Sequence, residues 1–282
     1  MKKVWKSPYT RRDAGFGLMH SHRLAAASSL ANLPLLEGLE QLPGVTLEGS
    51  TAADMRFLLC HGIVDAALLP CIDLQRADES LIVLPAGCVS SAGTALTCRV
   101  FSHVRPKEIQ TLWVDSEAHT ATALAQVLWH FLFKRRLNII PFTPGAWDPC
   151  DDAQAVLIGT DHAVSQPPLG YDYQFDLGRM WFEMTGLPFV FDVWAANGNA
   201  HCAELSRVLA ACRRDGQDNL HEIARRHAAT YDWPQDLAER YLSSYMLYEF
   251  TDAHREGMEE FFELAAESGA IDLARTVQYQ SL

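Results

Sequence analysis

The fold class is decided by three short apolar runs, Leu24-Ala-Ala-Ala-Ser28, Val45-Thr-Leu-Glu48 and Val64-Asp-Ala-Ala-Leu-Leu-Pro70. Each run has the length and apolar character of a strand buried in a sheet. Helical segments separate them: an apolar stretch that opens near Pro34, and residues 51–61, in which apolar residues recur on one face. This alternation predicts an α/β fold with a mainly parallel sheet and helices on both of its faces.

The alternation restarts further along the chain and predicts a second α/β unit. Strands are expected near residues 95–102, 110–115, 137–141, 153–159 and 189–194, and helices near 119–133, 203–214, 218–229, 234–248 and 253–268. Hinged lobes that close on a ligand are a common mechanical scheme. We therefore expect two lobes with hinge strands near residues 97–103 and 188–195.

The expected boundaries follow from this organisation. They are a flexible N-terminal extension (1–22), a discontinuous first lobe (23–102 plus 191–282, with the C-terminal helices) and a second lobe (103–190).

Composition narrows the class of partner. The 35 acidic and 23 basic residues give a formal net charge of −12, which disfavours nucleic acid and anionic membranes as partners. The seven cysteines are scattered, so neither a disulfide framework nor a structural zinc site is expected. No apolar run approaches the ~20 residues that span a bilayer. The basic N-terminus lacks the apolar core of a signal peptide, so the sequence predicts a cytoplasmic location.

Three polar loops lie where α/β folds bind ligands, at the carboxyl ends of strands beside helix N-termini. They are Ser28-Ser-Leu-Ala-Asn32, Ser90-Ser-Ala-Gly-Thr94 and Asp115-Ser-Glu-Ala-His-Thr120. Their hydroxyl and N–H donors would face an anion. Each loop also has a purely structural interpretation. The first would be a plain helix cap and the second a polar loop between the lobes. The third would be a first helical turn whose N–H groups are already hydrogen-bonded, and there Glu117 would repel an anion. Asp161-His162 could form a charge pair facing the same cleft, or lie in a surface loop.

Common catalytic motifs do not occur in the sequence. It has no Gly-rich dinucleotide motif, P-loop, H-E-x-x-H or G-x-S-x-G. The residues alone therefore indicate only a two-lobed α/β protein with a cleft that prefers small anions.

One long stretch is more specific. Residues 175–196 read Phe-Asp-Leu-Gly-Arg-Met-Trp-Phe-Glu-Met-Thr-Gly-Leu-Pro-Phe-Val-Phe-Asp-Val-Trp-Ala-Ala. They resemble the Y-D-L-G-x-x-W-x-x-x-T-G-L-P-F-V-F-A-x-W signature of the chorismate dehydratases of the futalosine route to menaquinone. Further segments resemble the same family in order, namely Arg23 to Leu35, Val64 to Ile72, Val89 to Thr94, Val114 to Thr122 and Gly257 to Ile271.

The resemblance implies a periplasmic-binding-protein-like (type II) fold in a cytoplasmic enzyme. The implied reaction is loss of water from chorismate to give 3-[(1-carboxyvinyl)oxy]benzoate, without a redox cofactor or metal. Two carboxylates on the substrate would suit helix N-termini on opposing lobes, and closure of the lobes would position the leaving hydroxyl.

This chain differs from the family's motifs mainly at their polar positions. The Asn of the family's S-Y-L-N motif falls on Ala31, and Asn32 stands one place later. In the third loop, serine positions become Glu117, Ala118 and Ala121, and the arginine becomes His119. Either Asn32 enters the site through a one-residue shift of the turn, or the ligand differs, or catalysis is lost.

We therefore expect a divergent chorismate-dehydratase-like lyase with a small anionic substrate. Asn32 would orient or polarise the leaving hydroxyl. The expected substrate-binding residues are Ser28 and Ser29 in the first lobe, Ser90 and Ser91 at one carboxylate, and Ser116, His119 and Thr120 at the other. The rivals are a non-catalytic binding protein for a small carboxylate and an enzyme like 1,4-dihydroxy-6-naphthoate synthase, whose motifs fit less well.

Overall fold

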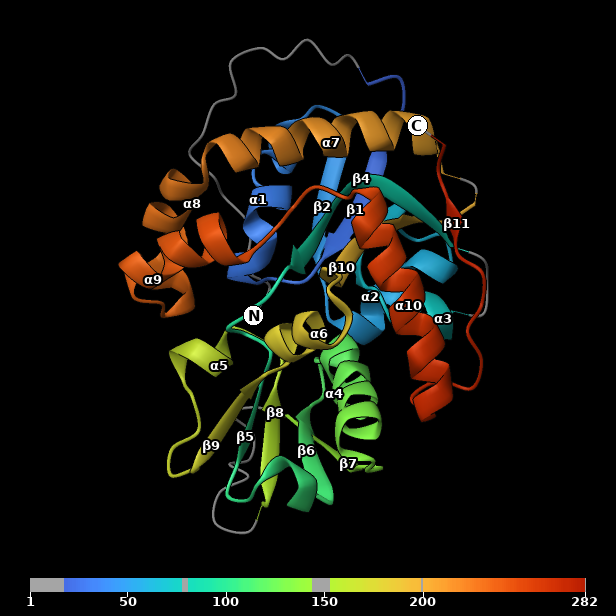
Figure 1. Ribbon diagram of the computed structural model, residues 1–282. Coiled ribbons are helices and arrows are strands. Elements are labelled where there is room, and N and C mark those ends of the chain that lie inside the picture. The colour runs from blue at the N-terminus through green and yellow to red at the C-terminus, as the bar shows by residue number, and fades with distance from the viewer. Residues whose placement is uncertain (1–17, 78–80, 144–152, 199, 282) are drawn as a thin grey trace.

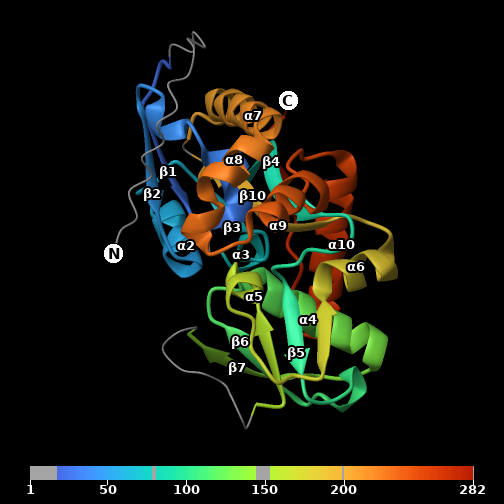
Figure 2. The ribbon, with the colours of Figure 1, turned by 90° about the vertical axis from the view of Figure 1, so that its left-hand side faces the viewer.

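The computed structural model describes residues 18–77, 81–143, 153–198 and 200–281, which are arranged around two separate sheets (Figure 1). Figure 2 shows the same two sheets from the side, again one above the other. No helix in these four ranges is long and apolar enough to cross a membrane.

The first sheet has six strands in the order β11-β4-β10-β3-β1-β2. The strands are β1 (His22–Ala26), β2 (Val45–Gly49), β3 (Ala66–Pro70), β4 (Ile82–Ser91), β10 (Phe189–Ala196) and β11 (Gln278–Tyr279). β1 pairs in parallel with both β2 and β3, so the three apolar runs form the parallel unit that the sequence predicts. β3 is buried along its whole length, as a strand covered on both faces requires.

The short helices of this part of the chain follow the strands. They are η1 (Leu30–Asn32), α1 (Leu33–Leu36), η2 (Leu39–Gln41), α2 (Ala52–Cys60) and α3 (Asp73–Arg76). The hydroxyl of Thr51 caps α2 by accepting a hydrogen bond from the N–H of Asp54.

The second sheet has five strands in the order β7-β6-β8-β5-β9. The strands are β5 (Arg99–Ser102), β6 (Thr111–Asp115), β7 (Asn138–Phe142), β8 (Ala155–Ile158) and β9 (Tyr173–Asp176), and the helices are η3 (Pro106–Glu108), α4 (His119–Phe133), α5 (His162–Ser165) and α6 (Leu177–Thr185). α4 buries most of its apolar residues because it packs between this sheet and α10 (Asp252–Ser268).

The chain crosses between the sheets twice, after β4 and after α6. Arg99–Ser102 pairs with β8 and β9, so it belongs to the second sheet, whereas Phe189–Ala196 already belongs to the first. We therefore propose lobes that meet at residues 92–98 and 186–188, a few residues before the expected boundaries.

The strand expected over 95–102 begins only at Arg99. The carboxylate of Asp176 accepts hydrogen bonds from the N–H groups of Ala95 and Leu96, at 3.0 and 2.8 Å. Leu96 has a positive φ of 56°. These bonds hold residues 95 and 96 in a turn, so they cannot continue the ladder.

The expected N-terminal extension is only partly described, because residues 1–17 lie outside the described ranges. Residues 19–22 are not a free extension. The backbone N–H of Met19 and the Nδ1 of His20 contact the carboxylate of Glu204 at 2.7 and 2.8 Å. The contacts with His20 and Met19 lower the pKa of Glu204 to about 2. His22 is buried and is the first residue of β1, two residues before the predicted start.

The C-terminal part is helical, as predicted. It comprises α7 (Cys202–Asp218), α8 (Leu220–His227), η4 (Ala228–Tyr231), α9 (Gln235–Arg240), η5 (Tyr241–Tyr245) and α10. α7 packs against α1 and β4, whereas α10 contacts both β10 and α4 and so joins the two lobes (Figure 1). The helix expected over 234–248 ends earlier because Leu247 forms a β-bridge with Ser90.

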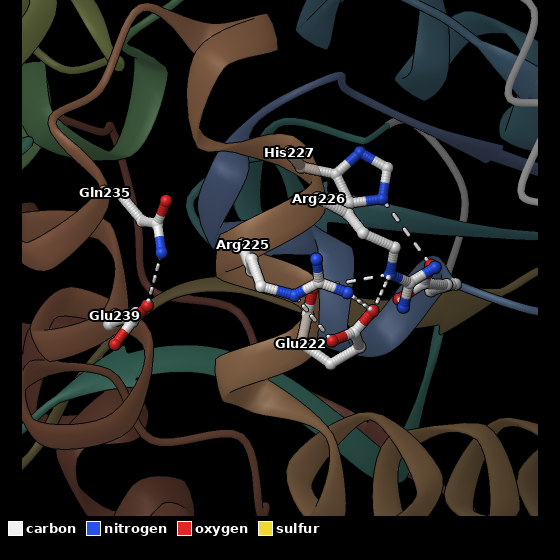
Figure 3. Close-up of polar contacts among 7 residues, drawn as sticks. Glu222, Arg225, Arg226, His227, Gln235 and Glu239 are labelled. Atoms are coloured by element: carbon white, nitrogen blue, oxygen red, sulfur yellow. Dashed lines mark hydrogen bonds and ion pairs between the residues drawn. The ribbon is translucent and has the colours of Figure 1, made fainter.

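An ion-pair cluster fixes α8 on the first lobe. Figure 3 shows the carboxylate of Glu222 in contact with Arg225 and Arg226. Arg226 also donates to both carboxylate oxygens of Glu37, the residue that follows α1. The Nε2 of His227 lies 3.5 Å from the Glu37 carboxylate. Although burial alone would raise the pKa of Glu37, His227 and Arg226 lower it below its ordinary value. This cluster positions the η4 turn that follows α8, in which the Tyr231 hydroxyl contacts Ser28 of the first loop.

Candidate active site

A cavity of about 90 Å³ lies between the two lobes. The first lobe contributes Ser29, Ala31, Asn32, Pro70, Val89, Phe191 and Asp192; the second contributes Glu117, Ala118, His119, Thr120, Ala121, Gly159, Thr160 and Asp161; and Thr97, Cys98, Tyr241 and Met246 complete the lining. The cavity therefore combines loops one and three of the sequence analysis with residues far away in the chain.

Asn32 lines this cavity and carries a buried acceptor without a partner among the described residues. Its Nδ2 donates to the carbonyl of Ala27 at 3.0 Å, and the hydroxyl of Ser29 accepts from the N–H of Asn32 at 3.3 Å. The Oδ1 of Asn32 is buried and has no hydrogen-bond partner among the described residues. An unsatisfied buried carbonyl oxygen costs roughly 1–3 kcal/mol, which a ligand hydroxyl would relieve.

Four of the predicted binding serines do not line the cavity, and the hydroxyls of three of them are hydrogen-bonded to other groups. Ser28 shares a hydrogen bond with the Tyr231 hydroxyl at 3.0 Å. Ser90 and Ser91 are fully buried at the end of β4 and donate to the carbonyls of Leu247 and Gly93. The backbone of Ser116 extends the pairing with Phe142. The structure thus places Ser28, Ser90, Ser91 and Ser116 outside the lining and keeps Ser29, Asn32, His119 and Thr120 inside it.

His119 is held from the other lobe. Its Nδ1 lies 2.6 Å from an Oδ2 of Asp73, a fully buried carboxylate at the start of α3. Thr120 donates to the carbonyl of Phe191 at 3.1 Å. The sequence predicts His119 as a cation for an anionic ligand, but the structure shows that its Nδ1 is already paired with a carboxylate. Its Nε2 makes no hydrogen bond to the described residues and is available to a ligand.

Two carboxylates of the second lobe occupy N–H groups of the first. Glu117 accepts from the N–H of Ala52, the first residue of α2, at 2.9 Å. Asp161 accepts from the N–H of Leu30 and from the indole of Trp233, both at 3.0 Å. The N–H of Leu30, one of the backbone donors expected to bind a ligand anion, is thus occupied by a side chain of the protein. Both carboxylate contacts hold the lobes together.

Asp192 is a polar residue of the site that the sequence analysis missed. It lies on β10, within a run that otherwise reads as an apolar strand. Burial and the neighbouring Asp73 raise the pKa of Asp192 to about 7, against an opposing effect of His119. The available signal was the motif itself, since the quoted signature has Ala where this chain has Asp192.

The charges around the cavity are mainly acidic. None of the described residues that line it is a lysine or an arginine. Nor do the described residues contain a group of three or more His, Cys, Asp or Glu side chains that could hold a metal ion. The site therefore offers hydrogen bonds and groups that can exchange protons.

Comparison with known proteins relates the chain to one family and one fold. A family described as menaquinone biosynthesis matches residues 22–267. A chorismate dehydratase of Thermus thermophilus is 25% identical over 248 residues, covering 83% of this chain and 91% of that protein. Protein AF1704 from Archaeoglobus fulgidus has a TM-score of 0.72 at 14% identity, covering 90% and 99% of the two chains.

A binding protein has the same fold. The periplasmic aliphatic sulphonate binding protein SsuA from Escherichia coli has a TM-score of 0.62 at 13% identity, covering 93% and 94% of the two chains. These similarities confirm the predicted two-lobed, periplasmic-binding-protein-like fold.

Proposed function

This chain belongs to the menaquinone biosynthesis family, and from that premise we propose that it removes water from chorismate to give 3-[(1-carboxyvinyl)oxy]benzoate. One observation carries the proposal: the buried, unpartnered Oδ1 of Asn32 belongs to a residue that lines the same cavity as His119. The similarity to a chorismate dehydratase supports the choice of substrate. We propose a cytoplasmic location with it, as the biosynthetic role suggests.

The proposed reaction requires only orientation of the substrate and proton transfer from the protein. A ring C–H bond and the adjacent C–O bond break, a ring double bond forms, and the product is aromatic. Aromatisation supplies the driving force, so the site must orient the leaving hydroxyl and move protons. The Oδ1 of Asn32 would accept a hydrogen bond from that hydroxyl and fix its direction. The Nε2 of His119 would accept the ring proton, because Asp73 holds the opposite nitrogen and stabilises the imidazolium.

The acidic lining favours a second candidate, a binding protein without turnover. A dianion such as chorismate would meet Glu117, Asp161 and Asp192, with no lysine or arginine among the described lining residues. Each carboxylate near a ligand carboxylate weakens binding unless it is protonated or moves away. A less anionic ligand would fit this lining better.

Turnover decides between the two candidates. Purified protein is incubated with chorismate, and the aromatic product is followed by chromatography against a heat-denatured control. We expect product from the wild type and a loss of rate on the order of 100-fold in Asn32→Ala. Asn138→Ala is the matched control, because Asn138 is exposed at the far strand of the second sheet.

If the wild type forms no product beyond the denatured control, the dehydratase proposal fails. A thermal-shift screen of small carboxylates and sulfonates then tests the binding protein, which predicts a raised Tm without consumption of the ligand.

A further inference from the structure

We propose that Asp192 is the proton donor to the leaving hydroxyl, and that His119, which pairs with Asp73 across the two lobes, returns the proton to it. The inference rests on the proposed function and deepens it, since it assigns the acid of the reaction to a residue on the strand that returns from the second lobe to the first.

Asp192 lines the cavity at an irregular point of β10. Asp192 pairs with Pro70 on one side and with Val89 on the other, and the register of β10 against β4 shifts between Val190 and Asp192. A shift of this kind is typical of a β-bulge, which turns a side chain away from the regular alternation. The preceding carbonyl, of Phe191, is held by the N–H of Cys71 at 2.9 Å and by the hydroxyl of Thr120. Asp192 is therefore set on a rigid and irregular point of the sheet.

The surroundings of Asp192 favour its protonated form. The titratable groups that interact with it are Asp73 on α3, His119 on α4, Cys71 after β3, Cys88 on β4 and Tyr241 on η5. Burial and Asp73 raise its pKa to about 7, and His119 opposes them. A carboxyl group with this pKa is substantially protonated at neutral pH, as a general acid must be.

The assignment balances the reaction. The Nε2 of His119 takes the ring proton, and the electron pair of that C–H bond forms the new double bond. The C–O bond breaks, and the hydroxyl takes the proton of Asp192 and leaves as water. Asp192 is then a carboxylate beside an imidazolium, and transfer of one proton from His119 to Asp192 restores both groups. No further reactant is needed.

Closure of the lobes would bring Asp192, His119 and Asp73 together. Asp73 and Asp192 belong to the first lobe, and His119 begins α4 of the second. The 2.6 Å contact between His119 and Asp73 exists only while the lobes are together. Separation would remove the imidazole that returns the proton, so turnover requires the closed form.

The experiment combines a direct titration with kinetics on the full-length protein. The Asp192 carboxyl is titrated by carbon NMR of protein labelled at aspartate, with Asp192→Asn identifying the signal. We expect a midpoint near pH 7 that moves to lower pH in Asp73→Asn, because the variant removes the carboxylate that raises it. For chorismate turnover, kcat/KM should fall as pH rises through 7, since the acid loses its proton.

Variants separate catalysis from structure. Asp192→Asn should lower kcat at least 100-fold, change KM little and abolish the fall in rate above pH 7. Asp54→Asn, on the exposed first turn of α2, is the matched control and should keep the wild-type profile.

A midpoint below pH 5, or an Asp192→Asn variant with the wild-type rate and profile, would overturn the assignment. Absence of product from the wild type would instead overturn the proposed function, and the assignment of Asp192 as donor to a leaving group would fall with it. In that case the titration still decides whether Asp73 and Asp192 are coupled.

Discussion

The contact between Asp161 and Trp233 should contribute measurably to stability, because it joins the two lobes. Asp161 follows β8 in the second lobe, and Trp233 is a buried residue between η4 and α9. The indole N–H donates to the Asp161 carboxylate at 3.0 Å, and the same carboxylate accepts from the N–H of Leu30. A hydrogen bond to a charged acceptor in a partly buried place contributes about 1.5–3 kcal/mol.

A double-mutant cycle isolates this bond. Trp233→Phe removes the indole N–H and keeps an aromatic ring, and Asp161→Ala removes the acceptor. Each single variant also changes packing or the bond to Leu30, so neither value alone measures the contact. The free energies of unfolding in urea for the wild type, both single variants and the double variant give the coupling directly. We expect a coupling of about 1.5–3 kcal/mol.

Asp236 lies on the exposed surface of the neighbouring α9, so a cycle between Asp236→Ala and Trp233→Phe should give a coupling within about 0.5 kcal/mol of zero. A coupling that small for Asp161 and Trp233 would show that the interlobe bond contributes nothing, and the account of closure would be wrong. Small-angle scattering should also show a larger radius of gyration for Asp161→Ala.

Three further predictions concern stability. The pKa of Asp192 is raised to about 7, so the folded protein keeps a proton that the unfolded chain releases near pH 4. The free energy of unfolding should therefore fall as pH rises from about 4 to 7. Asp192→Asn should remove this slope and, in urea unfolding at pH 8, be more stable than the wild type by on the order of a few kcal/mol. Gly216→Ala should lower stability by about 3 kcal/mol or more, because a Cβ there collides with the backbone of Pro34, whereas Gly198→Ala meets open space and should unfold like the wild type. Arg226→Ala should cost about 2–4 kcal/mol, because it removes the guanidinium that contacts both oxygens of the mostly buried Glu37 carboxylate. The exposed Arg225→Ala should cost under about 1 kcal/mol, and equal shifts in Tm for the two variants would contradict the role of this cluster (Figure 3).

The sequence by itself was sufficient to predict the fold class. The strand Ala66 to Pro70 is buried along its whole length, and its uninterrupted apolar sequence already indicates a strand that is covered on both faces. The long motif over residues 175–196 also identified the family, which the comparison confirmed. The strand expected from residue 95 begins only at Arg99, because the Asp176 carboxylate, some 80 residues away, turns the chain at Ala95.

The membership of the site was decided by the tertiary structure. Ser29 and Ser90 look alike as loop serines, but only contacts with Leu247, far along the chain, show that Ser90 is occupied. In the sequence, Asp192 is a single polar residue within an apolar strand. Only the fold brings it close enough to Asp73 and His119 for their charges to act on it. The physical reason is that a polar side chain is available for chemistry only when no other group has satisfied it, and the competing partners come from distant parts of the chain.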